Sequence, residues 1–231
     1  MVGANQVNNA RHNYNITIRE ADGEKDAFFL TRQREHYFGI EYESQQKLPT
    51  DLFPIANWTL SDESKEGKSI IDSFGVIAEH TPTPDQSVRI GGGIVILLPQ
   101  EPMIKELELG SFNTQDTTGK TNALFILNAV DPSWRGLGIG ERILKKRLEW
   151  VINSNAEMAF AYGWERDNTN QESHPLFKNA EFTPIEKIPN LYAKINIEAC
   201  PDCNVWPSDS DNCTCDGIIW VKDITEANPP A

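Results

Sequence analysis

Basic side chains are scarce in this chain of 231 residues, which has 21 Lys and Arg against 34 Asp and Glu. The formal net charge is −13, and the sequence pI is about 4.7. A protein of this charge is repelled by phosphate backbones and by anionic lipid surfaces. The composition therefore favours solubility and argues against nucleic-acid and membrane partners.

Long apolar runs are also missing. No stretch reaches the roughly 18 apolar residues of a membrane-spanning helix, and the polar, Asn-rich N-terminus lacks the apolar centre of a secretion signal. We therefore expect a cytoplasmic protein. Residues 1–13 have almost nothing to bury, so we expect them to form a disordered tail.

Cysteine is absent from the first 199 residues, and all four cysteines then fall within one short segment. Cys200 and Cys203 form a C-x-x-C pair, and after nine further residues Cys213 and Cys215 form a C-x-C pair. Two close pairs of thiols can supply the tetrahedral set of sulfurs that structural Zn²⁺ prefers. We expect residues 198–231 to form a small, zinc-ribbon-like C-terminal segment and tail. Disulfides fit poorly in a chain without a secretion signal, and the less standard C-x-C spacing leaves a redox or unliganded cluster as the alternative.

The most informative segment that is present, residues 124–152, consists of an apolar run, a Pro turn, a glycine-rich loop and an amphipathic helix. Arg135 opens the loop, and Gly136, Gly138 and Gly140 leave its backbone N–H groups accessible at the positive end of the helix. This arrangement predicts a pyrophosphate site. The P-loop motif is absent, and the glycine spacing does not match the dinucleotide-binding motif. A tight turn without a ligand is the remaining alternative.

The loop matches the signature R/Q-x-x-G-x-G/A at Arg135, Gly138 and Gly140, so the chain resembles the GCN5-related N-acetyltransferases (GNAT). The resemblance implies a GNAT domain over residues 14–197, of α+β (α/β) class, with a mixed central sheet of about six to seven strands flanked by helices. It also implies an N-acyltransferase that moves an acetyl group from acetyl-CoA directly to an amine of a small molecule or protein. The residues that would bind acetyl-CoA, chiefly through their backbones, are Ala129, Val130, Arg135, Gly136, Leu137, Gly138, Ile139 and Gly140.

The pattern of apolar residues predicts the order of strands and helices. A polar stretch with two prolines between the second and third strands suits a hairpin turn, and Gly91 to Gly93 predict a bulge or a close backbone approach. The expected strands are 14–20, 70–79, 88–98, 124–130, 158–164 and a final strand or hairpin within 182–197. The expected helices are 24–38, the helix that follows the glycine loop, and 174–180.

The helix after the glycine loop carries apolar residues on one face, which we expect to pack on the sheet. Its basic residues Lys145, Lys146 and Arg147 are expected on the opposite, solvated face. The apolar residues are Ile143, Leu144, Leu148, Val151 and Ile152.

The catalytic residues are less clearly marked. Many members of the resembled family carry a Tyr that protonates the departing sulfur, in a segment L-Y-x-K-x-G-F. This chain has Phe177 there, which cannot donate a proton. His174 and Tyr162 are candidate replacements, and Glu165 is a candidate general base. The alternatives are structural: His174 with Pro175 can simply begin a helix, and Glu165 can belong to a solvated loop.

Two further hypotheses stay open from the sequence. Phe177 is compatible with an inactive CoA-binding or regulatory module, and the cysteine segment with a nucleic-acid-modifying acyltransferase. In the resembled family, variable N-terminal helices and loops build the acceptor pocket, which would correspond to residues 24–66 and 100–120. The acidic composition makes a cationic amine a plausible acceptor.

Overall fold

The computed structural model describes residues 14–38, 72–99, 121–166, 173–191, 200 and 203–225. The expected N-terminal tail, most of the first acceptor region and all of the second lie outside the described residues. Within the described part of the chain, no helix combines the length and the apolar character needed to cross a membrane.

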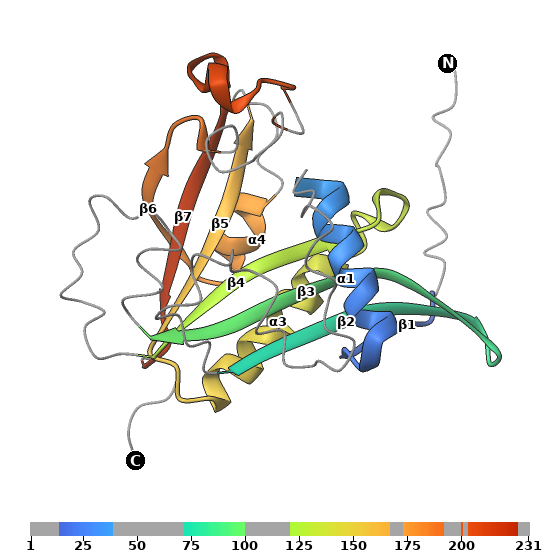
Figure 1. The fold of residues 1–231 in the computed structure, drawn as a ribbon. Helices are drawn as coiled ribbons and strands as arrows, with labels where there is room; N and C mark the ends of the chain where they lie inside the picture. The colour runs from blue at the N-terminus through green and yellow to red at the C-terminus, as the bar shows by residue number, and fades with distance from the viewer. Residues whose placement is uncertain are drawn as a thin grey trace, which may run out of the picture.

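A seven-stranded mixed sheet forms the centre of the molecule, in the order β1-β2-β3-β4-β5-β7-β6 (Figure 1). Neighbouring strands are antiparallel except β4 and β5, which are parallel. The expected sheet and the expected α+β class are confirmed. The strands are β1 (Ile16–Glu20), β2 (Asp72–Thr83), β3 (Gln86–Pro99), β4 (Thr121–Val130), β5 (Met158–Arg166), β6 (Thr183–Ile188) and β7 (Cys215–Asp223).

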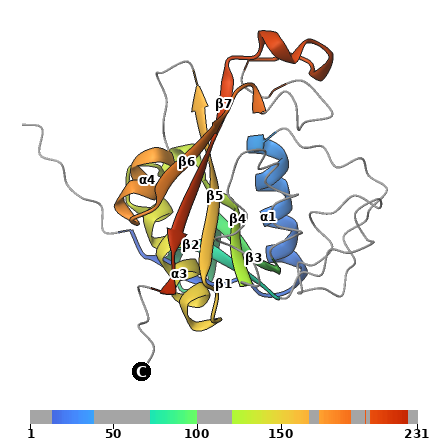
Figure 2. The same cartoon turned by 90° about the vertical axis from the view of Figure 1, so that its left-hand side faces the viewer.

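Helices cover both faces of this sheet (Figure 2). Helix α1 (Gly23–Phe38) buries Leu30 against one face, and helices α3 (Ile139–Asn153) and α4 (Ser173–Asn179) cover the other. Ile143, Leu144 and Val151 are buried as expected for the apolar face of α3. Two short 3₁₀ helices, η4 (Pro132–Trp134) and η5 (Pro207–Asn212), lie in loops. The sheet therefore separates two apolar layers, which we call the α1 face and the α3/α4 face.

The β2–β3 hairpin shows why β3 contains three consecutive glycines. A Cβ atom on Gly92 would collide with Leu30 of α1, and one on Gly93 would lie 2.7 Å from Cζ of Arg147 on α3. The glycines thus let a helix approach each face closely, which is the close approach predicted from sequence. A register shift also falls beside Gly91, between Ala78 and Glu79 of β2.

The C-terminal part of the sheet differs from the sequence-based expectation. Residues 198–231 were expected to stand apart as a small segment, but Cys215–Asp223 form β7, which pairs with β5 on one side and β6 on the other. The first three cysteines lie in the loop between β6 and β7. Because β7 is an inner strand, this segment completes the main sheet.

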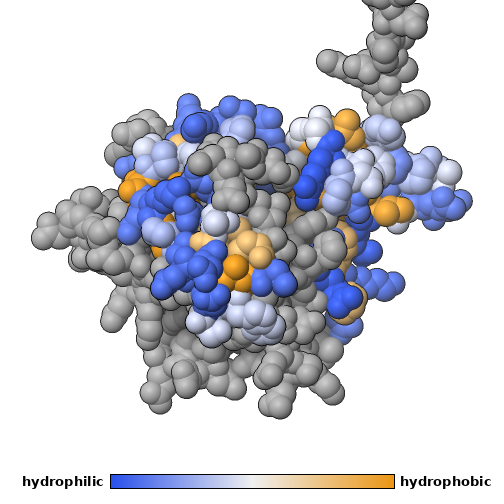
Figure 3. All heavy atoms as spheres, turned by 90° about the horizontal axis from the view of Figure 1, so that it is seen from above, coloured by the Kyte–Doolittle hydropathy of each residue, from blue (hydrophilic) through white to orange (hydrophobic). Residues whose placement is uncertain are grey.

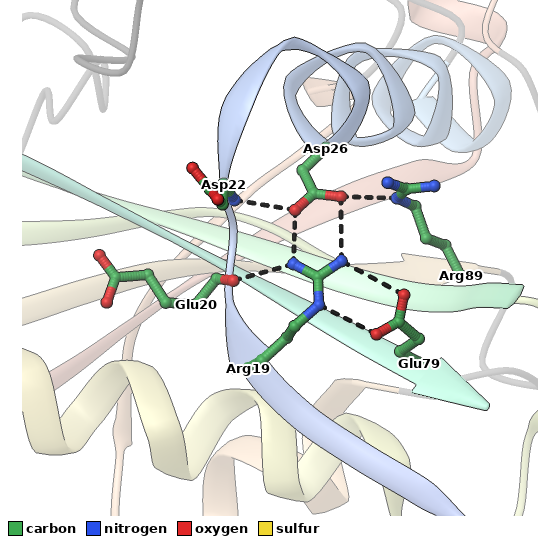
Figure 4. A network of polar contacts seen from close by, with 6 residues as sticks. All are labelled: Arg19, Glu20, Asp22, Asp26, Glu79 and Arg89. Atoms are coloured by element: carbon green, nitrogen blue, oxygen red, sulfur yellow. Dashed lines mark hydrogen bonds and ion pairs between the residues drawn. The ribbon is translucent and has the colours of Figure 1, made fainter. Parts of the chain in front are cut away.

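A polar network fixes the start of α1 on the sheet (Figure 4). Asp26 of α1 accepts hydrogen bonds from Arg19 of β1, from Arg89 of β3 and from the backbone N–H of Asp22. Arg19 also donates to Glu79 of β2. Burial raises the pKa of Asp26, but the bonds from Arg19, Asp22 and Arg89 more than offset this and leave the pKa below its ordinary value. One buried carboxylate therefore links α1 to strands β1 and β3.

The surface agrees with the acidic, polar composition. Seen from the end of the sheet that carries the β6–β7 loop, the described residues present mostly hydrophilic atoms with small apolar areas between them (Figure 3). The large apolar side chains that are exposed include Phe28 on α1, Leu137 in the glycine loop and Trp206 near η5. They belong to different elements of the fold.

Candidate functional site

Strands β4 and β5 pair with each other where they begin and separate further along. Their parallel pairing runs from Asn122 with Met158 to Phe125 with Ala161, whereas β4 continues to Val130 and β5 to Arg166. A register shift between β3 and β4 leaves an extra residue in β4 at the point of separation. Beyond this point the facing edges of β4 and β5 are not paired with each other. An extended chain of amides can bind such an edge as an added strand does.

The glycine loop lies where β4 ends and α3 begins. Gly136 and Gly138 have φ values of 77° and 73°, which residues with a side chain rarely adopt. A Cβ atom on either would meet nothing within 4 Å. Gly138 is the N-cap of α3 and offers no side-chain hydrogen bond to the first turn. Arg135 donates from Nε to the carbonyl oxygen of Val130 at 3.2 Å. The loop is thus an open, uncapped helix start, suited to an anion.

Asn128 connects this loop to the interior. A Cβ atom on Gly140 would lie 3.4 Å from Nδ2 of Asn128, which is ordinary van der Waals contact. The Oδ1 atom of Asn128 accepts a hydrogen bond from Arg147 of α3. The third glycine of the motif thus faces β4 at the start of α3, while the first two serve the backbone conformation of the loop.

Arg147 was expected on the solvated face of α3, and this expectation is wrong. The side chain is 0 % exposed and donates to the carbonyl oxygens of Ile94 and Leu127, in addition to Asn128. Its Cζ atom lies 4.9 Å from the centre of the Phe125 ring. Burial lowers the pKa of Arg147 to about 9, so the guanidinium is still charged at neutral pH. The buried cation links α3 to β3 and β4 just where β4 leaves β5.

Lys145 and Lys146 are exposed, as expected. The sequence signal for Arg147 was its spacing, because it lies four residues after Ile143 and four before Val151, both buried.

The three side chains expected to carry catalysis lie on different faces of the sheet. Tyr162 is half-buried on the α1 face, where it contacts the apolar cluster around Leu30 and the cysteines. His174 is buried on α4, with its ring centre 5.3 Å from that of Trp220. Glu165 of β5 forms an ion pair with Lys187 at 3.2 Å. The structure thus separates Tyr162 from His174, which packs in the α3/α4 layer.

The surroundings of His174 determine its charge. Burial lowers the pKa of His174 below its ordinary value, and the charge of Glu165 opposes this decrease. Lys178 and Lys187 add to the decrease. The imidazole is therefore neutral at physiological pH.

Phe177, at the position where the resembled family carries Tyr, is buried in the α3/α4 layer. Its ring centre lies 5.5 Å from that of Phe182 and 5.6 Å from that of Trp220. Only 4 % of the residue is exposed. The ring therefore fills the core beside Trp220, and proton donation from this position is impossible.

The four cysteines form one cluster in space. The sulfur atoms of Cys200, Cys203, Cys213 and Cys215 all lie within 4.8 Å of one another, and none of the four forms a disulfide bond. Tetrahedral zinc with Zn–S bonds of about 2.3 Å separates its sulfurs by about 3.8 Å, so the donor set fits that metal. Burial raises the pKa of Cys213 to about 11 and raises that of Cys215 as well. A cation is what would allow these crowded thiols to ionise together.

The cluster lies on the α1 face of the sheet. Tyr162 and Trp164 of β5 pack against it, as do Ile188 at the end of β6 and Val205 in the β6–β7 loop. The cysteines therefore support the same end of β5 that diverges from β4.

Comparison with known proteins agrees with this geometry. Residues 108–182 match the model described as "Acetyltransferase (GNAT) family". No curated protein sequence matches the chain at a significant level. The solved structures that share the fold include the following three. NAA60 of Arabidopsis thaliana in complex with acetyl-CoA has 15 % identity and a TM-score of 0.57, over 91 % of this chain and 99 % of that one.

The other two structures are similar at the same level. Arabidopsis thaliana Naa50 in complex with a bisubstrate analogue has 14 % identity and a TM-score of 0.52, over 90 % of this chain and 98 % of that one. A mosquito arylalkylamine N-acetyltransferase-like protein, 5b, has 14 % identity and a TM-score of 0.51, over 90 % of this chain and 99 % of that one. At these identities the likeness concerns the fold.

Proposed function

The chain carries an acetyltransferase domain of the GNAT family, and from this premise we propose that it transfers an acetyl group from acetyl-CoA to an amine of a small molecule or protein. The observation that supports the proposal best is the combination of an uncapped, glycine-rich helix start with two parallel strands that diverge beside it. The first suits the pyrophosphate of the cosubstrate, and the second suits its amide-containing arm.

In this proposal each part of the cosubstrate has a defined place. The backbone N–H groups from Gly136 to Gly140, including those of Leu137 and Ile139, bind the pyrophosphate, with Arg135 at the edge of the loop. Ala129 and Val130 of β4 bind the arm through their backbone groups. The thioester then lies in the opening beyond Ala161 of β5, where no β4 residue pairs with β5.

The two faces of the sheet have separate roles in the proposed reaction. The acceptor amine approaches from the α1 face, because α1 belongs to the region that builds acceptor pockets in the family, and Tyr162 lies there. His174 and Glu165 lie away from that side and are proposed to act near the sulfur. The amine nitrogen forms a bond to the thioester carbon and loses a proton to solvent, while the C–S bond breaks and its electron pair leaves on sulfur.

Replacing Gly138 by Asp tests the proposal. The carboxylate would repel the pyrophosphate at the helix start, so we expect calorimetry to show acetyl-CoA binding weakened by at least about 100-fold. Gly23→Asp is the matched control, because Gly23 also has a positive φ, of 67°, and open space around it, but begins α1. Equal affinities of the two variants would refute the assignment of the loop.

An activity measurement separates the enzyme from an inactive binding module. The wild-type chain should release free thiol from acetyl-CoA in the presence of suitable members of a panel of amines, including aryl-alkyl amines and peptides with free N-termini. These two classes are chosen because the similar solved structures include an arylalkylamine N-acetyltransferase-like protein and Naa50 in complex with the bisubstrate analogue CoA-Ac-MVNAL. Binding of acetyl-CoA without thiol release for any amine would favour the binding module.

We also propose that Cys200, Cys203, Cys213 and Cys215 bind one structural zinc ion. The proposal rests on the four sulfur atoms within 4.8 Å of one another. The metal would stabilise the β6–β7 loop and the start of β7. The four cysteine sulfurs would then occupy all four ligand positions of tetrahedral zinc, which leaves no open position for substrate.

A further inference from the structure

Three buried polar atoms in the α3/α4 layer have no hydrogen-bond partner among the described residues: Oγ of Ser173, Nε2 of His174 and Nε1 of Trp220. Trp220 is 1 % exposed and His174 is 6 % exposed. A buried donor or acceptor without a hydrogen-bond partner destabilises the fold, so three in one place require an explanation.

These atoms gather around Gly163 of β5. A Cβ atom on Gly163 would lie 2.5 Å from Nε1 of Trp220 and 3.3 Å from Oγ of Ser173. The His174 ring packs edge-on to the Trp220 ring. Because Gly163 has no side chain, the indole N–H and the hydroxyl both come within reach of the β5 backbone.

Gly163 lies where β5 has already left β4. The last β5 residue that pairs with β4 is Ala161, two residues earlier, while Gly163 itself pairs with Ile218 of β7. Trp220 extends over β5 from β7, since its own strand partner is Ala161 and its Nε1 atom lies over Gly163. The unsatisfied donors thus lie beside the opening in which the proposed function places the thioester.

We propose that the indole N–H of Trp220 and the hydroxyl of Ser173 donate hydrogen bonds to the sulfur of coenzyme A as it departs. This inference rests on the proposed function. It supplies what the chain lacks at Phe177, because two hydrogen bonds stabilise the negative charge that develops on sulfur. The C–S bond breaks with its electron pair on sulfur, the amine nitrogen loses its proton to solvent, and the thiolate regains one from solvent on release.

His174 serves as a positioning residue in this arrangement. Its ring packs edge-on against Trp220 and holds the indole over Gly163. The charged groups that act on it are Glu165 of β5, Lys178 of α4 and Lys187 of β6. Lys187 itself is paired with Glu165 and Asp216, so its charge is partly neutralised.

The test compares binding of coenzyme A with binding of desulfo-coenzyme A, which lacks the sulfur, by calorimetry at pH 7 and pH 9. Alkyl thiols ionise above neutral pH, so a larger fraction of the sulfur is thiolate at pH 9 than at pH 7. Wild-type protein should bind coenzyme A at least about tenfold more tightly than the desulfo analogue at pH 9, with a smaller difference at pH 7. Trp220→Phe and Ser173→Ala should each reduce this difference and leave the affinity for the desulfo analogue unchanged.

Steady-state kinetics provide the second measurement. Each variant should lower kcat by at least about tenfold, with little change in KM for acetyl-CoA, because the hydrogen bonds strengthen only as charge develops. Trp150→Phe is the matched control, since Trp150 lies on α3 and stacks on Phe74 with ring centres 5.2 Å apart. Ser173→Ala keeps the test valid if Trp220→Phe fails to fold, because Ser173 is only partly buried.

Each outcome has a distinct meaning. A sulfur-dependent affinity that persists in both variants, or an unchanged kcat, would overturn the inference. Failure of wild-type protein to bind either coenzyme A or the desulfo analogue would instead overturn the proposed function.

Discussion

At the scale of single residues, Arg147 is the side chain whose replacement should matter most outside the loop. Its guanidinium is buried and charged, and its acceptors are two main-chain carbonyls and an amide oxygen. A buried cation held by neutral dipoles is stable only while each of these bonds is made. The buried guanidinium also explains why residue 93 is glycine, since any side chain at that position would displace the guanidinium.

Arg147→Ala should lower the free energy of unfolding by on the order of 3 kcal/mol, because the acceptors on β3 and β4 would remain buried and unpaired. Lys146→Ala, at the neighbouring exposed position, should change it by less than about 0.5 kcal/mol. Urea denaturation of both variants measures the difference. Similar midpoints for the two variants would contradict the role given to Arg147.

The sequence predicts residues with a local rule well and residues with a long-range partner poorly. The position of the glycine loop before α3, with Gly136 and Gly138, was predicted because a helix start with positive φ selects glycine from local geometry alone. The spacing of Arg147 places it on the buried face of α3, but its burial was missed because the acceptors that make a buried cation tolerable are on β3 and β4, far away in the sequence. The donor pair Ser173 and Trp220 was missed for the same reason: α4 and β7 meet only after β7 enters the sheet.

At the scale of elements, α1 is attached to the sheet by Asp26 and its arginine partners. The folded protein holds the pKa of Asp26 below its ordinary value, so the carboxylate stabilises the fold above the pKa of the unfolded chain, about 3.9. This contribution is lost as the pH falls through the lower, folded pKa. Glu79 shifts in the same direction because of its bond to Arg19.

Asp26→Asn should therefore be less stable than wild type by about 3 kcal/mol at pH 7, and this difference should shrink below about pH 4 and vanish as the wild-type carboxylate protonates. Asp22→Asn is the control, because only the backbone N–H of Asp22 bonds to Asp26. Thermal unfolding across this pH range measures both variants. A difference that stays constant down to pH 2 would show that the charge of Asp26 is not what stabilises α1.

Among the elements, the spacing of apolar residues predicts most strands and helices, but it did not lead to a prediction of β7. Residues 218 to 221 (IIWV) form a short apolar run of the kind that a buried strand shows. The neighbouring cysteines pointed instead to a separate metal-stabilised segment. Which sheet edge a strand joins depends on contacts distant in sequence, here with β5 and β6, and no local pattern reports them.

At the scale of the whole molecule, the proposed zinc site connects the β6–β7 loop to the divergent end of β5. Trp164 and Tyr162 pack on the cysteines from β5. Thiolate ligation of structural zinc contributes on the order of 10 kcal/mol, enough to order a loop with little apolar area of its own.

Cys203→Ser should release the metal and make the β6–β7 loop sensitive to protease, while acetyl-CoA binding at the glycine loop survives. Metal analysis of protein purified without chelator should find one zinc per chain in wild type and in the control Asp211→Asn, an exposed position in the same loop. Protein without zinc in both would refute the site. Loss of acetyl-CoA binding in Cys203→Ser alone would show that the metal supports more than its own loop.

The position of β7 has a further consequence for synthesis of the protein. On the ribosome, β5 and β6 leave the exit tunnel before β7, although β7 lies between them. Until residues 215–223 emerge, the edge of β5 that will receive β7 is unpaired, and an open edge can recruit strands from other nascent chains. Folding of this sheet must therefore finish after translation has passed Asp223. In chains that stop earlier, the edges of β5 and β6 that β7 would have paired with stay open. Such chains should be substrates for chaperones and proteases.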